Sequence, residues 1–87
     1  MEVVKKKIHP KFFDLVFSGK KRFEFRLADF NVKAGDMLVL QEWDPETKKY
    51  TGRSLIKKVG YVAKFDLNDF GQKELLEKNG FYIIQFD

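Results

Sequence analysis

The residues best able to do chemistry in this chain gather in residues 18–26, which read SGKKRFEFR. Four of the nine are basic, namely Lys20, Lys21, Arg22 and Arg26. Arginine can direct two parallel N–H donors at a phosphate, and lysine supplies a compact positive charge. The cluster therefore predicts a binding site for an anionic ligand. The simpler interpretation is that cations near the end of a helix offset the negative end of its dipole.

Glu24 is the one carboxylate of this stretch. Together with Lys21 it forms a candidate catalytic pair, because a carboxylate or an amine can act as a general base on a bound water. Glu24 and Arg26 also lie two residues apart, on one face of an extended segment, where an ion pair with a structural role is the simpler interpretation. A shifted pKa of Glu24 in a cleft would favour catalysis.

Three further candidates for nucleic-acid binding belong to the polar residues 43–53. Trp43 and Tyr50 could stack on unpaired bases, a contact worth about 1–3 kcal/mol per base. Trp43 could equally cover the end of the small β-barrel that we expect for this chain. Arg53 would extend the basic cluster of residues 18–26.

Composition excludes several kinds of site. The chain has no Cys, so it has neither disulfides nor thiolate metal ligands, which fits a reducing compartment. Its single histidine, His9, precedes a proline and leaves no metal centre or Ser-His-Asp triad to assemble. We therefore expect no metal and no cofactor. We also expect a cytoplasmic location, because no apolar stretch approaches the roughly 20 residues that span a membrane. A net charge of +4 suits either nucleic-acid binding or a solvated basic surface.

These side chains need a scaffold, and 87 residues suit one domain spanning residues 1–87. Pro10 is typical of the first turn of a helix, and Gly19 of the position that ends one. The hydrophobic pattern predicts a strand, a helix, three strands, a helix and a strand, over residues 2–8, 10–19, 21–27, 37–42, 54–65, 67–78 and 81–86.

Further features of the pattern complete the predicted fold. Residues 43–53 are expected to form a long hairpin loop, and Gly60 to mark a bulge or bend. Phe23 and Phe25, like Tyr61 and the alternating Phe residues, are expected in the core. Strand residues outnumber helical ones, which favours an α+β fold built as a small, mostly antiparallel β-barrel capped by two short helices. Closure of the barrel would remove exposed strand edges.

Several of these motifs resemble the signature of ASCH domains, a branch of the PUA-like superfamily of small RNA-associated pseudo-barrels. The resemblance rests on Gly19-Lys20-Lys21, Phe23-Glu24-Phe25-Arg26 and Gly35-Asp36, and covers about residues 5–86. The segments EWDPET (42–47) and YTGR (50–53) look like an uncharacterised ASCH-like family of bacteria and phages. The resemblance implies a barrel with a cleft between the first helix and the sheet, bordered by Gly19, Lys21 and Arg26.

Some ASCH proteins are amidohydrolases that act on a modified cytidine. They use a Lys and a Thr from a Gly-x-Lys-Thr-x-Thr-x-Arg segment, with a distant Glu. Gly19, Lys21 and Arg26 match that segment, whereas Arg22 and Glu24 stand at the two Thr positions, so the expected nucleophile is missing.

Three hypotheses about function follow. The leading one is a module that binds RNA or another nucleic acid through a basic cleft beside the first helix and residues 21–27. The alternative is a small amidohydrolase acting on a modified nucleoside with Lys21 and Glu24. The third is a protein that binds a host protein, for which the sequence offers no positive feature. None of the three involves a membrane.

Overall fold

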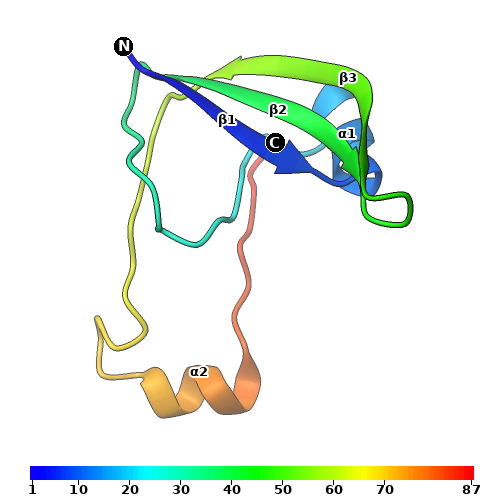
Figure 1. Cartoon of the computed structure of the whole chain (residues 1–87). Coiled ribbons are helices and arrows are strands. Elements are labelled where there is room, and N and C mark those ends of the chain that lie inside the picture. Colours follow the sequence, from blue (N-terminus) through cyan, green and yellow to red (C-terminus); the bar gives the residue numbers. More distant parts are fainter.

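The computed structural model describes all 87 residues and contains a three-stranded sheet with two short helices (Figure 1). In chain order the elements are β1 (Val3–Ile8), α1 (Pro10–Phe17), β2 (Met37–Asp44), β3 (Lys49–Lys58) and α2 (Lys73–Asn79). The sheet has the order β1-β2-β3, with β1 parallel and β3 antiparallel to the central strand. The α+β class is confirmed, but the sheet is mixed and open, so the expected closed, mostly antiparallel barrel is not formed.

Helix α1 begins and ends where local signals in the sequence place it. Pro10 occupies the first turn, where its missing N–H removes no helical hydrogen bond. After the helix, Gly19 adopts a φ of +81°, a left-handed conformation that glycine adopts without steric strain. Phe13 and Val16 are buried, because they lie three residues apart on one side of the helix.

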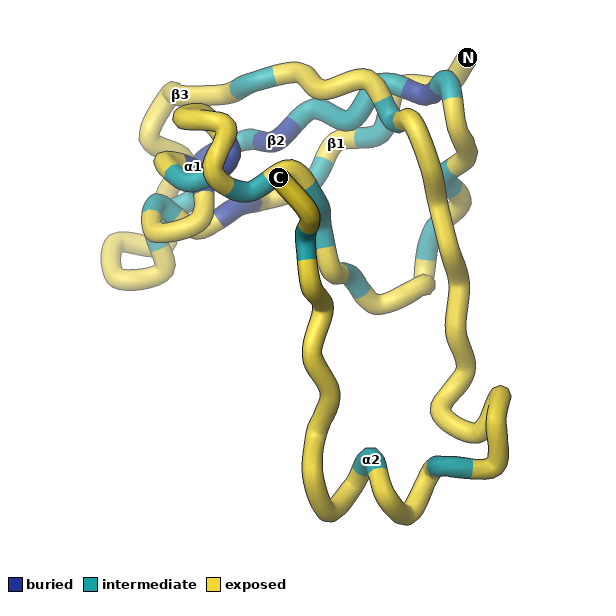
Figure 2. The backbone as a smooth tube through the Cα atoms, turned by 180° about the vertical axis from the view of Figure 1, so that it is seen from behind, coloured by how far each residue is buried: buried dark blue, intermediate teal, exposed yellow.

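The core lies between α1 and one face of the sheet. Phe13 and Val16 pack there with Ile8 of β1 and Leu40 of β2. Figure 2 shows that the buried parts of the chain are confined to the region of the sheet and α1. This face of the sheet therefore carries the hydrophobic contacts that hold the fold together.

The opposite face of the sheet carries no helix. Side chains of a strand alternate between faces, and the register sets Val3 beside Met37 and Lys5 beside Val39. Ile56 of β3 is the partner of Val39. We call this surface the outer face, and it consists of Val3, Lys5, Met37, Val39, Ile56 and Lys58. Val3 and Ile56 are 56% and 60% exposed, so apolar surface of the sheet faces solvent. The apolar run of residues 37–40 is typical of a strand covered on both faces, but a helix packs on one face only.

The hairpin of β2 and β3 is more regular than the sequence suggested. Residues 43–53, expected to be a long loop, belong mostly to strands, and only a short turn separates Asp44 from Lys49. The pairing is interrupted once, because one residue, Glu42, faces the three residues 51–53 of β3. This irregularity is a β-bulge, and its residues on β3 lie seven to nine residues before Gly60, where a bulge or bend was predicted.

Residues 21–27 and 81–86 do not form the predicted strands. The two segments nevertheless lie side by side. The Gln85 side-chain oxygen accepts a hydrogen bond from the Arg22 N–H at 2.5 Å, and its amide nitrogen donates to the Lys20 carbonyl at 3.1 Å. The rings of Phe25 and Phe81 meet edge to face at 5.2 Å. Side chains thus join two segments that were each expected to be a strand.

The last part of the chain, residues 60–87, leaves the body as a long loop that we call the arm (Figures 1 and 2). The strand predicted over 54–65 ends at Lys58, and the helix predicted over 67–78 is replaced by the shorter α2. Tyr61 and Phe65, expected in the core, are 85% and 69% exposed. Their alternating pattern fits one face of a strand, but residues 61–65 form no strand and all of them are exposed.

Asp36, directly before β2, is hydrogen-bonded to the backbone at the start of β1 and in the preceding loop. Its Oδ1 accepts the Glu2 N–H at 2.9 Å and its Oδ2 accepts the Lys33 N–H at 3.0 Å. Asp36 is buried, and these two backbone donors hold the pKa of its carboxyl below the ordinary value of 3.8.

We expect Asp36→Asn to lower the melting temperature at pH 7 by roughly 5 °C, because the charged acceptor of two N–H groups is lost. The pKa of Asp36 is lower in the folded state, so the carboxylate stabilises the fold above about pH 4 and loses this effect as the pH falls through the folded pKa. The melting temperatures of the wild type and of Asp36→Asn should therefore converge as the pH is lowered from 7 to 2. A constant gap across this range would contradict the role given to the charge.

Candidate nucleic-acid interface

The structure distributes the predicted site residues over several neighbouring groups. Lys21, Glu24 and Arg26 meet in one network beside α1. Lys20 and Arg22 line a pocket at the end of α1. The remaining three candidates, Trp43, Tyr50 and Arg53, belong to the β2–β3 hairpin.

Glu24 lies between two cations. Its Oε1 accepts a hydrogen bond from Lys21 Nζ at 3.2 Å, and its Oε2 accepts one from Arg26 Nε at 2.8 Å. The contact with Arg26 is the ion pair that their spacing suggested. Lys21 also reaches Glu24, although strict alternation would place the two on opposite faces, because residues 21–27 do not form a regular strand. We call this group the Glu24 network.

The ammonium group of Lys21 is enclosed further by aromatic rings. It lies 5.2 Å from the centre of the Phe12 ring on α1 and 5.0 Å from that of Phe23. Both distances are within the range of a cation–π contact. The Lys21 side chain is only 18% exposed, so its charge is committed mainly to neighbouring protein groups.

Arg26 connects the Glu24 network to the β2–β3 hairpin through Lys7. Arg26 Nη2 donates a hydrogen bond of 2.7 Å to the carbonyl of Lys7 on β1. The ammonium group of the same lysine lies 4.5 Å from the centre of the Trp43 ring and 5.8 Å from that of Tyr50. The His9 ring is 6.3 Å from that of Trp43.

We call Lys7, His9, Trp43 and Tyr50 the hairpin cluster. Trp43 and Tyr50 are partners across β2 and β3, and Tyr50 is 54% exposed. Sequence reasoning found these two aromatic residues but missed Lys7 and His9 as their neighbours. The missing information was the parallel pairing of β1 with β2, which sets Lys7 beside Gln41 and so near the end of the hairpin.

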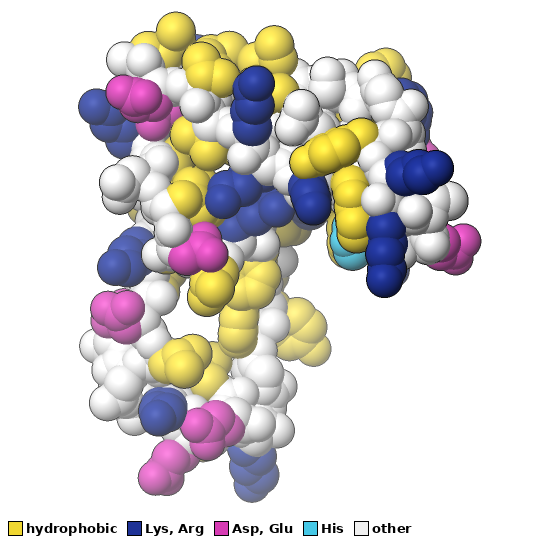
Figure 3. Space-filling model, in the orientation of Figure 1, with side chains coloured by type: hydrophobic (Ala, Val, Ile, Leu, Met, Phe, Trp, Pro, Cys, Tyr) yellow, Lys and Arg dark blue, Asp and Glu magenta, His cyan; other side chains and the backbone are white.

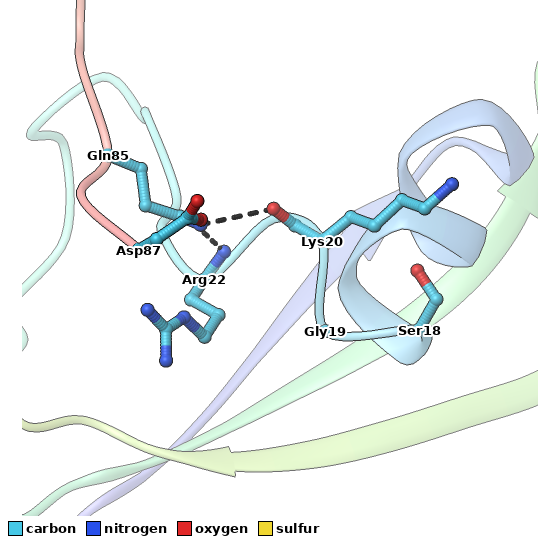
Figure 4. Close-up of a pocket in the computed structure, with 6 residues that line it drawn as sticks. All are labelled: Ser18, Gly19, Lys20, Arg22, Gln85 and Asp87. Carbon is cyan, nitrogen blue, oxygen red and sulfur yellow. Dashed lines mark hydrogen bonds between the residues drawn. The ribbon is translucent and has the colours of Figure 1, made fainter.

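A polar pocket lies at the end of α1, with a volume of about 490 Å³. It is lined by Ser18, Gly19, Lys20, Arg22, Gln85 and Asp87, none of them hydrophobic (Figure 4). Figure 4 shows the Lys20 side chain running away from Gln85 and Asp87, back along the end of α1. Arg22 Nη2 donates to the Phe86 carbonyl at 3.2 Å. The pocket thus offers polar groups of both signs, with the Lys20 ammonium at its edge.

Arg53 is held by acidic residues and not by the other basic candidates. Its Nε and Nη2 donate to the Glu42 carboxylate at 2.9 and 2.5 Å, and Nη2 also donates to Asp14 on α1 at 3.2 Å. The guanidinium lies 4.3 Å from the centre of the Phe13 ring. Thr51 Oγ1 donates to Glu42 at 2.5 Å. We call this group the Glu42 network.

The Glu42 network explains how a carboxylate is tolerated in the interior. Glu42 is buried, with 3% of its surface exposed. The two-pronged contact of Arg53, followed by the Thr51 hydroxyl, lowers the pKa of Glu42 from its ordinary value, and the same contact raises the pKa of Arg53. Sequence reasoning missed Glu42 and Asp14. The available signal was the carboxylate that ends the predicted strand 37–42, with an arginine on the other side of the hairpin.

Basic side chains share one side of the molecule with hydrophobic side chains (Figure 3). Figure 3 shows Lys and Arg side chains across the middle of the body, with hydrophobic side chains and further basic groups beside them at the right. Neither helix has the length or apolar character of a membrane-spanning segment.

Comparison with known proteins places this sequence among relatives without an assigned activity. Residues 3–76 match a family described as a domain of unknown function, DUF3850. A protein of Escherichia phage P2, described as "Uncharacterized 12.9 kDa protein in GpA 3'region", is 45% identical over 64 residues. The match covers 74% of this chain and 55% of the phage protein, so this chain spans about half the length of that relative. No solved structure matches significantly.

Proposed function

The chain belongs to the DUF3850 family, and from that premise we propose that it is an ASCH-like module of the PUA-like superfamily that binds single-stranded RNA. The ASCH assignment is supported by Gly19, Lys21 and Arg26, which match the family segment in type and spacing. The left-handed backbone conformation at position 19 gives a physical reason for a glycine there. Lys21 and Arg26 are joined by Glu24 beside α1.

One observation carries the proposal for RNA. The hairpin cluster combines an exposed aromatic ring, Tyr50, with a second ring, Trp43, and with the ammonium group of Lys7. Aromatic rings stack on unpaired bases, and nearby cations attract the phosphates between those bases. Arg26 donates to the carbonyl of Lys7, so further positive charge lies next to the aromatic surface.

The geometry favours a single strand over a duplex. Stacking on Tyr50 requires a base whose face is free, and the bases of a duplex stack on one another. A protein tells RNA from DNA through the 2′-hydroxyl group. Single-stranded DNA of the same sequence is therefore the competitor that tests the choice of RNA.

The test is a set of fluorescence anisotropy titrations of the wild-type protein with labelled single-stranded RNA, single-stranded DNA and duplex RNA. We expect the tightest binding to single-stranded RNA. The affinity should fall with salt, with a slope of about −0.7 per phosphate contacted. The proposal would be overturned by equal affinity for duplex and single-stranded RNA, or by the absence of binding at low salt.

We expect Lys20→Ala to reduce the steepness of this salt dependence by about 0.7 and to weaken RNA binding at low salt. The reason is that the Lys20 side chain extends along the end of α1, away from the acidic Asp87 (Figure 4). Lys78→Ala is the matched control, because it removes the same charge from α2 on the arm. Equal salt slopes for the wild type and Lys20→Ala would show that Lys20 contacts no phosphate.

A second candidate function is hydrolysis of an acylated nucleoside, favoured by the 3.2 Å contact between Lys21 Nζ and Glu24 Oε1. It is less favoured because both oxygens of Glu24 are engaged with cations and because no hydroxyl nucleophile occupies positions 22 or 24. The assay is turnover of N4-acetylcytidine by the wild type, Lys21→Ala and Glu24→Gln. Turnover that disappears in both variants would support this function, and turnover that survives in both would exclude the pair.

A further inference from the structure

Two apolar surfaces of this protein have no partner within the chain. One is the outer face of the sheet, where Val3 and Ile56 are more than half exposed. The other is the arm, whose exposed side chains include Phe70, Leu75 and Tyr82. Figure 3 shows hydrophobic side chains both along the top of the molecule, above the strands, and around the ring that the arm forms. Exposed apolar surface on this scale is typical of a protein–protein interface.

The arm is fastened at both ends, and its second attachment lies on the side of the sheet that α1 covers. Where the arm leaves β3, Val59 exchanges two backbone hydrogen bonds of 2.8 Å with Gly35 and Asp36. Where the arm returns, Gln85 bonds to the backbone of Lys20 and Arg22, directly after α1. Between these points the arm projects away from the sheet, with α2 at its far end (Figures 1 and 2).

These attachments keep the arm away from the outer face of its own sheet. Helix α1 packs on the opposite face, with Phe13 and Val16 against Leu40. To reach the outer face, the arm would have to give up its contacts with Lys20 and Arg22. The outer face of a second copy needs no such rearrangement, because the arm already projects into solvent.

The charges of the arm and the body are complementary. Residues 60–87 contain three Lys against five acidic residues, whereas residues 1–59 contain fourteen Lys or Arg against eight acidic residues. The arm therefore carries a net charge of −2 and the body one of +6. Lys5 and Lys58 border the apolar part of the outer face. Helix α2 carries two Glu and two Lys, so the acidic excess of the arm comes from Asp66, Asp69 and Asp87 against Lys64. An arm laid on the outer face brings opposite charges together.

We propose that two copies of this chain exchange their arms, each arm covering the outer face of the other copy. The same two surfaces meet twice, so the arrangement is closed by a two-fold axis and does not continue into a fibre. The apolar part of the outer face lies where β1 and β2 begin, whereas Trp43 lies at the far end of β2. In the proposed arrangement the arm covers this apolar part and leaves the hairpin cluster, which continues the same face toward the end of β2, open to ligand.

The test is sedimentation of the whole chain across a dilution series, with one variant on each of the two surfaces. We expect the wild type to sediment as a dimer at high concentration and to dissociate on dilution. Ile56→Glu, on the outer face, and Phe70→Glu, on the arm, should each weaken the dimer at least tenfold by placing a charge in the apolar contact. Phe17→Glu is the matched control, because Phe17 is 72% exposed on α1, outside both surfaces. Circular dichroism checks that each variant is folded.

Mixing the two variants distinguishes arm exchange from any other dimer. The arm of Ile56→Glu and the outer face of Phe70→Glu are both intact, so a mixture should form a mixed dimer through one junction. Either variant alone has no intact junction. A fluorescent label on one variant reports the mixed dimer directly. A wild type that stays monomeric, a dimer that tolerates Ile56→Glu, or a mixture that stays monomeric would overturn the proposal.

Discussion

Arg53→Met is expected to lower the melting temperature at pH 7 by roughly 10 °C, the largest effect on stability that we predict for a single substitution. The substitution removes both prongs of the contact with Glu42 and the contact with Asp14. Glu42 would then remain buried as a carboxylate with only the Thr51 hydroxyl as a donor. A buried charge without its partner destabilises a fold strongly, because neither water nor a counter-ion compensates it.

The effect should depend on pH in a defined direction. The pKa of Glu42 in the folded state lies below its ordinary value of 4.5, so the ion pair stabilises the fold above about pH 4.5 and this effect is lost as the pH falls through the folded pKa. The gap in melting temperature between the wild type and Arg53→Met should therefore be largest near neutral pH and should shrink below pH 4.

Two further variants serve as controls for Arg53→Met. Arg53→Lys keeps the charge but loses the fork of donors, so we expect an intermediate melting temperature. The double variant Glu42→Met/Arg53→Met removes both charges and should recover much of the loss. If Arg53→Met melts at the temperature of the wild type at pH 7, the Glu42 network does not hold β2, β3 and α1 together.

Tyr50→Ala is expected to weaken binding to single-stranded RNA by about 5- to 150-fold, the range that corresponds to the loss of one stacked base. Tyr50 is more than half exposed at the end of the hairpin, so its removal should leave the fold intact. Stacking does not depend on counter-ions, and the loss should therefore be similar at every salt concentration. Fluorescence anisotropy titrations at several salt concentrations measure both quantities.

Two control variants test whether the effect of Tyr50→Ala comes from the loss of an aromatic ring at this position. Tyr50→Phe keeps the ring and should bind RNA almost as tightly as the wild type. Phe17→Ala removes an exposed ring from α1, away from the hairpin cluster, and should leave RNA affinity unchanged. A loss of affinity in Phe17→Ala as large as that in Tyr50→Ala would contradict a stacking role for the hairpin cluster.

The elements that could be predicted from the sequence are those whose signals are local. Pro10 and Gly19 define the limits of α1, and the apolar run that begins at Met37 defines β2. The alternating residues of 21–27 and the apolar run of 81–86 are also typical of strands. A strand also needs a partner that accepts its backbone hydrogen bonds, and no local pattern states whether one is present.

In the candidate site, too, local features could be predicted and contacts between distant segments could not. Trp43, Tyr50 and the basic residues of 18–26 could be found by residue type, because aromatic and cationic side chains are the groups that bind nucleic acid. Their grouping could not be predicted. Lys7 meets Trp43 through the parallel pairing of β1 with β2, and Arg53 meets Glu42 through a bulge in the hairpin. Both contacts depend on register, which short sequence patterns do not determine.

The parallel pairing of β1 with β2 also has a consequence for the order of folding. Glu2 and Asp36, which bond at the start of this pair, are 34 residues apart, whereas β2 and β3 are joined by a short turn. Closing the longer loop costs more chain entropy, so the hairpin of β2 and β3 should form first and β1 should join it later. During synthesis, β1 is made first but must wait, unpaired, until β2 has emerged. The rate-limiting step of folding is therefore expected to be the docking of the N-terminal strand.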